Sequence, residues 1–275
     1  MPFPSKTALI TGATSGIGLA LAERLVANGT FVIAVGRRQD RLSDLVSAHG
    51  PDKVAAEPFD ITELDKLPQW VEKITSAYPT LDTIILNAGI QRSLDFTSPA
   101  AVSLSSVTTE LTTNYLAPVH LTTLFLPHLQ SLSPSTNTTT AATASIILIS
   151  SGLALVPIPR CANYCATKSA IHSLAWSLRA QLANHPGSSH IRVVEVVPPA
   201  VQTELHSQQP DLVAAGQVSF GMPLDEFTEE TWAALEEGAQ DEIIVGPAKN
   251  FAHVDVDRKK AFDQLVELFR GGAKA

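Results

Sequence analysis

Short runs of apolar, mostly β-branched residues alternate with longer amphipathic segments along the chain. Several runs are apolar on consecutive positions, which is typical of strands covered on both faces of a sheet. The segments between them repeat apolar residues with the period of a helix, as Ile17, Leu21 and Leu25 do before Gly29. This alternation predicts an α/β fold, a doubly wound parallel sheet with helices on both faces. The predicted strands are residues 7–10, 31–35, 54–59, 83–86, 145–149, 192–197 and 242–245.

Two stretches interrupt this alternation. Residues 131–145 are rich in Ser, Thr and Ala, and we interpret them as an exposed loop before the fifth strand. Residues 201–227 separate two strand–helix units, and a loop of that length in a compact domain usually either covers a site or is disordered. No internal repeat and no shift in composition marks a second domain. We therefore expect one domain over residues 1–275, with a substrate-covering loop at about 201–227.

The composition restricts the classes of partner and compartment. The 275 residues are 45% hydrophobic and 17% charged, with a formal net charge of -8. Binding to nucleic acid or to anionic lipid needs a basic surface, so both are disfavoured. We expect no signal peptide, and no apolar run approaches the roughly 20 residues of a membrane-spanning helix. Cys161 and Cys165 make a poor metal site by themselves and are interpreted as core or interface residues, which favours a reducing, cytoplasmic location.

A glycine-rich turn, TGATSGIG at residues 11–18, directly follows the first predicted strand and opens the next helix. Glycines let a backbone approach a ligand closely, and the free N–H groups at a helix start bind phosphate. The spacing Gly-x-x-x-Gly-x-Gly differs from the commoner Gly-x-Gly-x-x-Gly dinucleotide fingerprint. The turn indicates a phosphate-containing cofactor, and the alternative is a tight strand-to-helix turn without a ligand.

The end of the second strand bears on which dinucleotide is bound. A protein that holds the 2′-hydroxyl of an adenosine ribose usually has Asp or Glu there, roughly 20 residues after the glycines. This chain has Gly36 at that place, followed by Arg37 and Arg38, whose guanidinium groups attract a 2′-phosphate. NADP(H) is therefore favoured over NAD(H). The alternative is that the arginines lie on a solvated helix start.

A tyrosine and a lysine continue the core-facing stripe of a later helix. In ANYCATKSAIHSLAW, residues 162–176, that stripe contains Ile171 and Ala175, and further back it contains Lys168 and Tyr164. A buried phenol and a buried ammonium each need a partner, so we expect the pair to act on one ligand. The ammonium is expected to lower the tyrosine pKa from about 10, which suits proton transfer to a carbonyl or alcohol oxygen.

Two further polar residues are candidates for the same site. Ser151 follows the fifth predicted strand, at the edge where parallel sheets bind ligands. Its hydroxyl is placed to hydrogen-bond the reacting oxygen, with Ser150 as the competing candidate. Asn114 lies in a long helical segment, where an amide is a mediocre helix former. It either holds a local break or a water molecule, or it is an ordinary N-cap or surface residue.

The motifs TGATSGIG, Asn87-Ala88-Gly89 and YCATK, with Asn114 and Ser151, together resemble the short-chain dehydrogenase/reductase family over residues 7 to about 203. The resemblance implies one Rossmann-type domain with seven parallel strands that binds a dinucleotide and carries out catalysis. It implies that Tyr164 is the acid/base and that Lys168 holds the nicotinamide ribose and lowers the Tyr164 pKa. Ser151 would position the carbonyl, and Asn114 would support a water that relays protons to Lys168. The cofactor-binding residues expected from the motifs and the resemblance are Gly12, Thr14, Ser15, Ile17, Gly18, Arg37, Arg38, Asp60, Ile61, Asn87, Ala88, Gly89, Tyr164, Lys168, Val201 and Thr203.

One position departs from the family pattern. After the sixth strand the family usually has Pro-Gly, whereas this chain has Pro198-Pro199 in VVPPAVQTEL. Proline lacks a backbone N–H and fixes φ, so we expect a different backbone path beside the nicotinamide. Val201 and Thr203 still stand where the family contacts the carboxamide.

Apolar residues dominate the segments expected around the reacting group, which fits a small, largely apolar substrate. The leading hypothesis is an NADPH-dependent oxidoreductase that transfers a hydride between the nicotinamide and a carbonyl or secondary alcohol. The alternatives are a non-catalytic NADP(H)-binding sensor or scaffold, and a non-redox lyase or isomerase on the same fold. The residues expected to surround the substrate are Leu153, Ala154, Leu155, Val156, Ile158, Val201, Leu205, Leu212, Val213, Phe220 and Met222.

The outer face of the helix that contains Tyr164 bears on assembly. Small residues such as Ala162, Ala166 and Ser173 lie away from its core stripe and permit another helix to approach closely. With the family resemblance, they favour a homodimer or homotetramer that uses this helix. A contact within the same chain explains them equally well.

Overall fold

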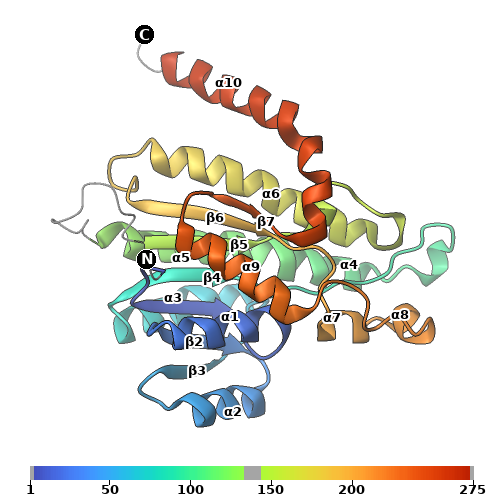
Figure 1. The fold of residues 1–275 in the computed structure, drawn as a ribbon, viewed down its shortest axis with the longest axis horizontal. Coiled ribbons are helices and arrows are strands. Elements are labelled where there is room, and N and C mark those ends of the chain that lie inside the picture. The colour runs from blue at the N-terminus through green and yellow to red at the C-terminus, as the bar shows by residue number, and fades with distance from the viewer. Residues whose placement is uncertain (1–2, 133–143, 273–275) are drawn as a thin grey trace.

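A seven-stranded sheet runs through the centre of the molecule (Figure 1), in a computed structural model that describes residues 3–132 and 144–272. Every strand pair is parallel, and the order is β3-β2-β1-β4-β5-β6-β7. The order reverses between β1 and β4, which is where doubly wound sheets bind ligands. The strands are β1 (Thr7–Thr11), β2 (Phe31–Gly36), β3 (Val54–Pro58), β4 (Leu81–Leu86), β5 (Ala144–Ile149), β6 (Ile191–Val197) and β7 (Glu242–Ile244).

All seven predicted strands are confirmed, with ends that differ by one or two residues. The largest difference is at β4, which begins at Leu81 and contains the buried Asp82. The carboxylate of Asp82 accepts hydrogen bonds from Ser5 Oγ and from the backbone N–H of Lys6, both at 2.8 Å. A buried carboxylate with these partners is tolerated in a strand, although it interrupts the apolar pattern.

Helices cover both faces of the sheet, as the alternating pattern predicted. Each central strand therefore places residues in two apolar layers, with Ile10 in one layer and its neighbour Leu9 in the other. One layer contains α1 (Gly16–Ala27), α2 (Gln39–His49) and α9 (Leu224–Glu237), and the other contains α3 (Leu67–Ala77), α5 (Ala117–Ser131) and α6 (Ala162–Ala183).

The segment 201–227, expected to be an irregular loop, contains regular structure. It includes two short helices, α7 (Glu204–Ser207) and α8 (Pro210–Ala214), and α9 already begins at Leu224. Val201 and Met222 form an isolated parallel β-bridge, so the two ends of the segment meet. Helices of four and five residues have too few apolar repeats to be predicted from periodicity.

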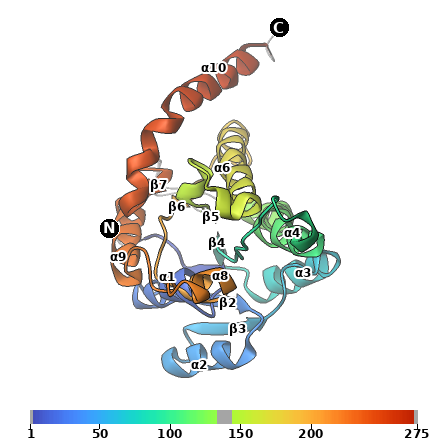
Figure 2. The ribbon, with the colours of Figure 1, turned by 90° about the vertical axis from the view of Figure 1, so that its right-hand side faces the viewer.

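The C-terminal region follows β7 as η6 (Gly246–Asp255) and α10 (Val256–Gly272). Figures 1 and 2 show α10 pointing away from the sheet and its covering helices. Among the described residues, no helix is long and apolar enough to cross a membrane. Most of the predicted loop 131–145 lies outside them, because residues 133–143 are not described.

Candidate active site

A cavity of about 600 Å³ lies at the carboxyl ends of the central strands. Its walls come from the glycine-rich turn, the ends of β2 and β5, the start of α6 and the segment 201–227. Two predicted site residues, Gly18 and Asn114, do not line the cavity. The predicted residues that do are Gly12, Thr14, Ser15, Ile17, Arg37, Arg38, Asp60, Ile61, Asn87, Ala88, Gly89, Ser151, Tyr164, Lys168, Val201 and Thr203.

The glycine-rich turn packs too closely for side chains at two of its positions. Gly12 has a φ of 72°, and a Cβ there would lie 3.0 Å from the Cα of Ala88. A Cβ at Gly18 would lie 2.3 Å from the carbonyl oxygen of Gly12. Ser15 precedes α1 but makes no side-chain cap, so it leaves the first N–H groups of this helix uncapped by its hydroxyl. This arrangement fits a phosphate group at the start of α1.

Gly16 is a cavity residue that the sequence analysis did not include. It has a φ of 54°, and a Cβ there would lie 3.1 Å from Cβ of Thr203. The glycine-rich turn and the segment 201–227 therefore touch at this point. The signal was present in the spacing Gly-x-x-x-Gly-x-Gly, in which Gly16 is the middle glycine.

Arg37 and Arg38 both line the cavity but have different surroundings. The Arg37 side chain is 68% exposed, and its guanidinium lies 3.6 Å from the carboxylate of Asp60. Arg38 folds back over the glycine-rich turn and donates to Thr14 Oγ1 at 2.7 Å and to Ser15 Oγ at 2.6 Å. Arg38 stands at the start of α2, as the alternative expected, but its side chain is held against the glycine-rich turn.

Tyr164 and Lys168 are buried and line the cavity, as their place on the helix stripe predicted. They are 7% and 4% exposed. Lys168 Nζ lies 5.6 Å from the centre of the Tyr164 ring and donates to the carbonyl oxygen of Ile149, the last residue of β5, at 2.8 Å. The two side chains thus lie together at the carboxyl end of the sheet.

The expected lowering of the tyrosine pKa is wrong in this structure. Burial raises the pKa of Tyr164 well above its ordinary value of 10.0, and a hydrogen bond with Ser151 offsets only part of that rise. Burial also lowers the pKa of Lys168 to about 8, although the carboxylates of Glu195 and Glu110 oppose this change. Burial is the largest cause of the raised pKa of Tyr164, and the nearby Glu110 carboxylate adds to it, so Tyr164 keeps its proton at neutral pH.

Ser151, rather than Ser150, is the serine beside the phenol. Ser151 lines the cavity with Tyr164 and accepts a hydrogen bond from the backbone N–H of Leu153 at 3.1 Å. The Ser150 hydroxyl donates instead to the carbonyl oxygen of Val196 on the neighbouring strand β6, at 3.3 Å. The choice made from the sequence agrees with this geometry.

Asn114 lies in a π-helical turn, Thr112–Leu116, between α4 (Leu104–Leu111) and α5. The predicted local break in the helix is therefore present. Its side chain accepts from the N–H of Ile90 and donates to the Ile90 carbonyl, both at 2.9 Å, and donates to Thr167 Oγ1 at 3.1 Å. Asn114 thus ties the chain after β4 to α6, directly behind the cavity wall.

Pro199 does not remove the following residues from the cavity. The carbonyl oxygen of Pro198 accepts from the N–H of Gly152 at 2.8 Å, which joins this segment to the chain after β5. Pro198, Pro199, Val201 and Thr203 all line the cavity. The backbone after β6 therefore returns to the site despite the second proline.

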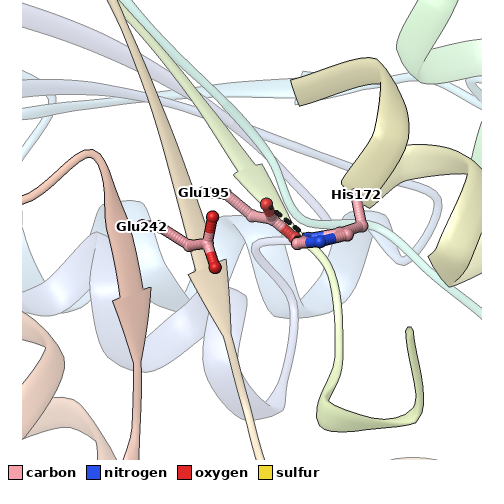
Figure 3. Close-up of side chains that lie close together, drawn as sticks. All are labelled: His172, Glu195 and Glu242. Atoms are coloured by element: carbon pink, nitrogen blue, oxygen red, sulfur yellow. Dashed lines mark hydrogen bonds and ion pairs between the residues drawn. The ribbon is translucent and has the colours of Figure 1, made fainter. Parts of the chain in front are cut away.

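A second cluster of buried polar groups lies one turn further along α6. Figure 3 shows His172 of α6 pointing toward Glu195 of β6, with Glu242 of β7 beside them. His172 Nδ1 lies 2.9 Å from both carboxylate oxygens of Glu195. On its other side, Nε2 lies 2.8 Å from Asp255, at an angle that is not that of a hydrogen bond. Burial disfavours a charged ring, but the carboxylates of Glu195, Glu242 and Asp255 together outweigh it and raise the pKa of His172.

Comparison with known proteins identifies the family. A family model described as short chain dehydrogenase matches residues 6–212. This chain belongs to the short-chain dehydrogenase/reductase family. It is 35% identical over 272 residues to the uncharacterized oxidoreductase DltE of Bacillus subtilis (strain 168), and the match covers 96% of this chain and 98% of that protein.

Solved structures of this short-chain dehydrogenase/reductase family have the same fold. A short chain dehydrogenase from Burkholderia cenocepacia J2315 in complex with NADP is 28% identical, with a TM-score of 0.73, and the match covers 96% of this chain and 99% of that one. A short-chain dehydrogenase from Sphingobium yanoikuyae in complex with NADPH is 25% identical, with a TM-score of 0.75 and coverage of 94% and 95%. The predicted Rossmann-type fold is thereby confirmed.

The sequence did not predict most of the polar residues that line the cavity of this family member. Gln91, Arg92, Arg160 and His206 line the cavity, although their sequence spacing gives no sign that they share a site. Arg160 lies 2.5 Å from Asp211 of α8, which joins the start of α6 to the segment 201–227. Of the apolar residues expected around the substrate, Leu153, Ile158, Val201, Leu205 and Phe220 line the cavity, and Ala154, Leu155, Val156, Leu212, Val213 and Met222 do not.

Proposed function

We propose that this member of the oxidoreductase family is an NADPH-dependent carbonyl reductase that runs reversibly as an alcohol dehydrogenase. The observation that carries the proposal is the burial of Tyr164 and Lys168 in the wall of a cavity shared with the glycine-rich turn. Burying a phenol and an amine costs folding free energy unless they gain partners, and a ligand in the cavity supplies such partners. The same two residues would also have chemical roles there. Tyr164 would transfer a proton, and Lys168 would hold the ribose of the cofactor.

The residues around the cavity fit a nicotinamide dinucleotide. The turn at Gly12 and the uncapped start of α1 suit a pyrophosphate, and Arg37 and Arg38 suit the 2′-phosphate that distinguishes NADP(H). Complexes of similar dehydrogenases with NADP and NADPH support this choice. When bound, the cofactor supplies or accepts the hydride, and Val201 and Thr203 would contact its carboxamide.

Tyr164 would donate the proton that the reduced carbonyl oxygen needs. The phenol, whose pKa is raised by burial, carries its proton at neutral pH and can therefore act as the acid in carbonyl reduction. Lys168, with a pKa of about 8, is mostly protonated at pH 7 and would hold the ribose of the cofactor. The bond from Lys168 to the carbonyl oxygen of Ile149 uses only one of its three N–H donors.

Ser151 and Asn114 would complete the site in different ways. The Ser151 hydroxyl, which lines the cavity with Tyr164, would hold the carbonyl oxygen next to the phenol. Asn114 would support the proton path to Lys168 from behind the wall. A Cβ at Gly89 would lie 3.3 Å from Asn114 Oδ1 and 3.6 Å from Lys168 Nζ, so a side chain there would crowd both of these groups.

The substrate that we propose is a small, largely apolar carbonyl compound or secondary alcohol. Leu153, Ile158, Leu205 and Phe220 give the cavity apolar walls near the predicted reaction centre. Apolar walls combined with polar groups, here Gln91, Arg160 and His206, are typical of sites for small organic molecules.

Three broader expectations belong to the same proposal. The whole chain, residues 1–275, would act as one dinucleotide-binding and catalytic domain. It would form a homodimer or homotetramer through the outer face of α6, where Ala166 and Ser173 are exposed. The free thiols of Cys161 and Cys165 suit a reducing, cytoplasmic location.

Oxidation of NADPH in the presence of a panel of apolar aldehydes and ketones tests the proposal. We expect turnover with the wild-type protein and a loss of about 10²–10⁴-fold in Tyr164→Phe, because the phenyl ring has no proton to transfer. NADPH binding, followed by its fluorescence, should remain in this variant. Tyr78→Phe is a matched control, since Tyr78 follows α3 and does not line the cavity.

The alternatives give different results in the same assay. Tight NADPH binding without turnover of any compound in the panel would favour a sensor or scaffold. Consumption of a substrate without oxidation of NADPH would favour a lyase or isomerase. Turnover that persists in Tyr164→Phe at the wild-type rate would contradict the role of Tyr164.

A further inference from the structure

A carboxylate and two guanidinium groups meet between the glycine-rich turn and the segment 201–227. Glu204, the first residue of α7, lines the cavity and lies 2.7 Å from Arg38 Nη1 and 2.5 Å from Arg41 Nη1. Arg41 belongs to α2 and also donates to the carbonyl oxygen of Thr14, at 3.3 Å. The two arginines therefore hold the Glu204 carboxylate at the edge of the cavity.

Every nitrogen of the Arg38 guanidinium already has an acceptor within the chain. Nε and Nη2 donate to Thr14 Oγ1, Nη2 also donates to Ser15 Oγ, and Nη1 donates to Glu204. A phosphate that approaches Arg38 from the cavity therefore meets a carboxylate on the same guanidinium. Two anions at one guanidinium repel each other, and the effect persists because neither side chain is fully exposed.

We propose that Glu204 competes with the 2′-phosphate of NADP(H) for Arg38 and thereby sets the preference between NADP(H) and NAD(H). This inference rests on the proposed function, since it assumes that a nicotinamide dinucleotide occupies the cavity. NAD(H) has a hydroxyl in place of the phosphate, so its binding does not require Glu204 to leave Arg38. Arg37 makes no ion pair with Glu204; its neighbour is Asp60 at 3.6 Å, and its 68% exposed side chain can reach the phosphate in either case.

The same competition connects the cofactor to the substrate side of the cavity. Glu204 is flanked by Thr203 and Leu205, and all three line the cavity. Glu204 forms two ion pairs, one with Arg38 and one with Arg41. When the 2′-phosphate binds Arg38 in place of Glu204, α7 loses the first ion pair and keeps the second. Occupancy by NADP(H), but not by NAD(H), should therefore alter the position of residues 203–207.

Substitution of Glu204 by glutamine tests the competition directly. Glu204→Gln keeps the shape of the side chain and removes its charge. We expect NADPH and the fragment 2′-AMP to bind about 5- to 20-fold more tightly to this variant, the range for a partly exposed charge-assisted contact. NADH and 5′-AMP should bind as they do to the wild-type protein. Dissociation constants are measured by calorimetry for the mononucleotides and by fluorescence for the dinucleotides, so no turnover is needed.

Matched variants separate this effect from a general change of charge or fold. Glu237→Gln removes the same charge at the exposed end of α9 and should leave all four affinities unchanged. Glu204→Ala should shift the affinities in the same direction as Glu204→Gln, and it replaces that variant if a thermal scan shows the glutamine form to be poorly folded. A gain for NADPH and 2′-AMP alone supports the inference.

The outcomes also distinguish this inference from the proposed function. If the wild-type protein binds neither NADPH nor NADH, the proposed function fails, and this inference fails with it. If it binds them but Glu204→Gln leaves the ratio of the two affinities unchanged, or weakens NADPH binding, Glu204 is a structural link only. The proposed function then stands without the competition.

Discussion

Two groups of buried polar side chains lie on the same helix, α6, and they differ in what they contact. At the start of the helix, Tyr164 and Lys168 face the cavity, and Lys168 has one hydrogen-bond acceptor, the Ile149 carbonyl, among the described residues. One turn further on, His172 is 0% exposed and lies between Glu195 and Asp255. The first group borders a cavity that can hold a ligand, and the second is enclosed by its own chain.

The difference shows that burial alone does not mark a functional residue. Tyr164, Lys168 and His172 are all polar, all nearly inaccessible and all on one helix. Only the first two border a cavity, so only they can exchange partners when a ligand binds. The carboxylates around His172 instead join α6 to β6 and to the C-terminal region, which makes that group a structural connection.

The largest effect that separates the two groups is on stability. His172→Leu leaves the buried Glu195 carboxylate without its imidazole partner, and we expect it to lower the free energy of unfolding by about 3–5 kcal/mol. Tyr164→Phe removes one hydroxyl that borders the cavity and should cost about 1 kcal/mol or less. Both values come from urea unfolding, with the slope compared between variants to check for a two-state transition.

A conservative change on the solvent side of α6 is the control for this comparison. Ser173 is exposed and follows His172 directly, so Ser173→Ala should leave the unfolding free energy within about 0.5 kcal/mol of wild type. If His172→Leu lowered the free energy of unfolding as little as Ser173→Ala, the imidazole would not stabilise the buried carboxylates. The contrast between the two groups would then disappear.

The sequence predicted the first group better than the second because of how each is encoded. Tyr164 and Lys168 lie four residues apart on a stripe continued by Ile171 and Ala175, so local periodicity brings them together. The partners of His172 come from 23 and 83 residues away (195 − 172 and 255 − 172), and no local pattern links them. The alternation of strands and helices likewise fixed the sheet, since it too is a local signal.

What escaped prediction depends on contacts between distant segments and on solvation. Glu204 meets Arg38 across the cavity edge, although 166 residues separate them. The short helices α7 and α8 are held by such contacts rather than by their own apolar repeats. The direction of the Tyr164 pKa was predicted wrongly because the sequence shows the neighbouring ammonium but not the depth of burial.

The two groups should also respond to pH with opposite signs. Lys168 has a pKa of about 8 in the folded protein and an ordinary value of 10.5, so above pH 8 the unfolded chain binds more protons. Its contribution to stability therefore rises with pH, by about 2 kcal/mol between pH 8 and pH 9.5. The pKa of His172 is raised from 6.5, so its contribution is fully present below pH 6.5 and is lost as pH rises through the raised value.

Unfolding curves of wild type, Lys168→Met and His172→Leu at pH 6, 8 and 9.5, without added cofactor, isolate the two contributions by subtraction. The difference between wild type and Lys168→Met should grow from pH 8 to pH 9.5 in favour of wild type. The difference between wild type and His172→Leu should shrink as pH rises above 6.5. If both differences changed in the same direction as the pH rises, the raised pKa of His172 or the lowered pKa of Lys168 would be assigned wrongly.

The smallest effect is expected at the solvent end of the His172 group. Arg258 lies 3.2 Å from Asp255 and 4.9 Å from the centre of the Trp176 ring, but its side chain is 47% exposed. Water and salt screen a pair of this kind, so Arg258→Ala should lower the unfolding free energy by only about 0.5–1 kcal/mol. Arg270→Ala, which breaks an exposed pair with Glu267 near the end of α10, serves as the baseline for a surface arginine. If Arg258→Ala cost as much as His172→Leu, the charge that balances Asp255 would come mainly from the arginine, and the imidazole would no longer be the centre of the group.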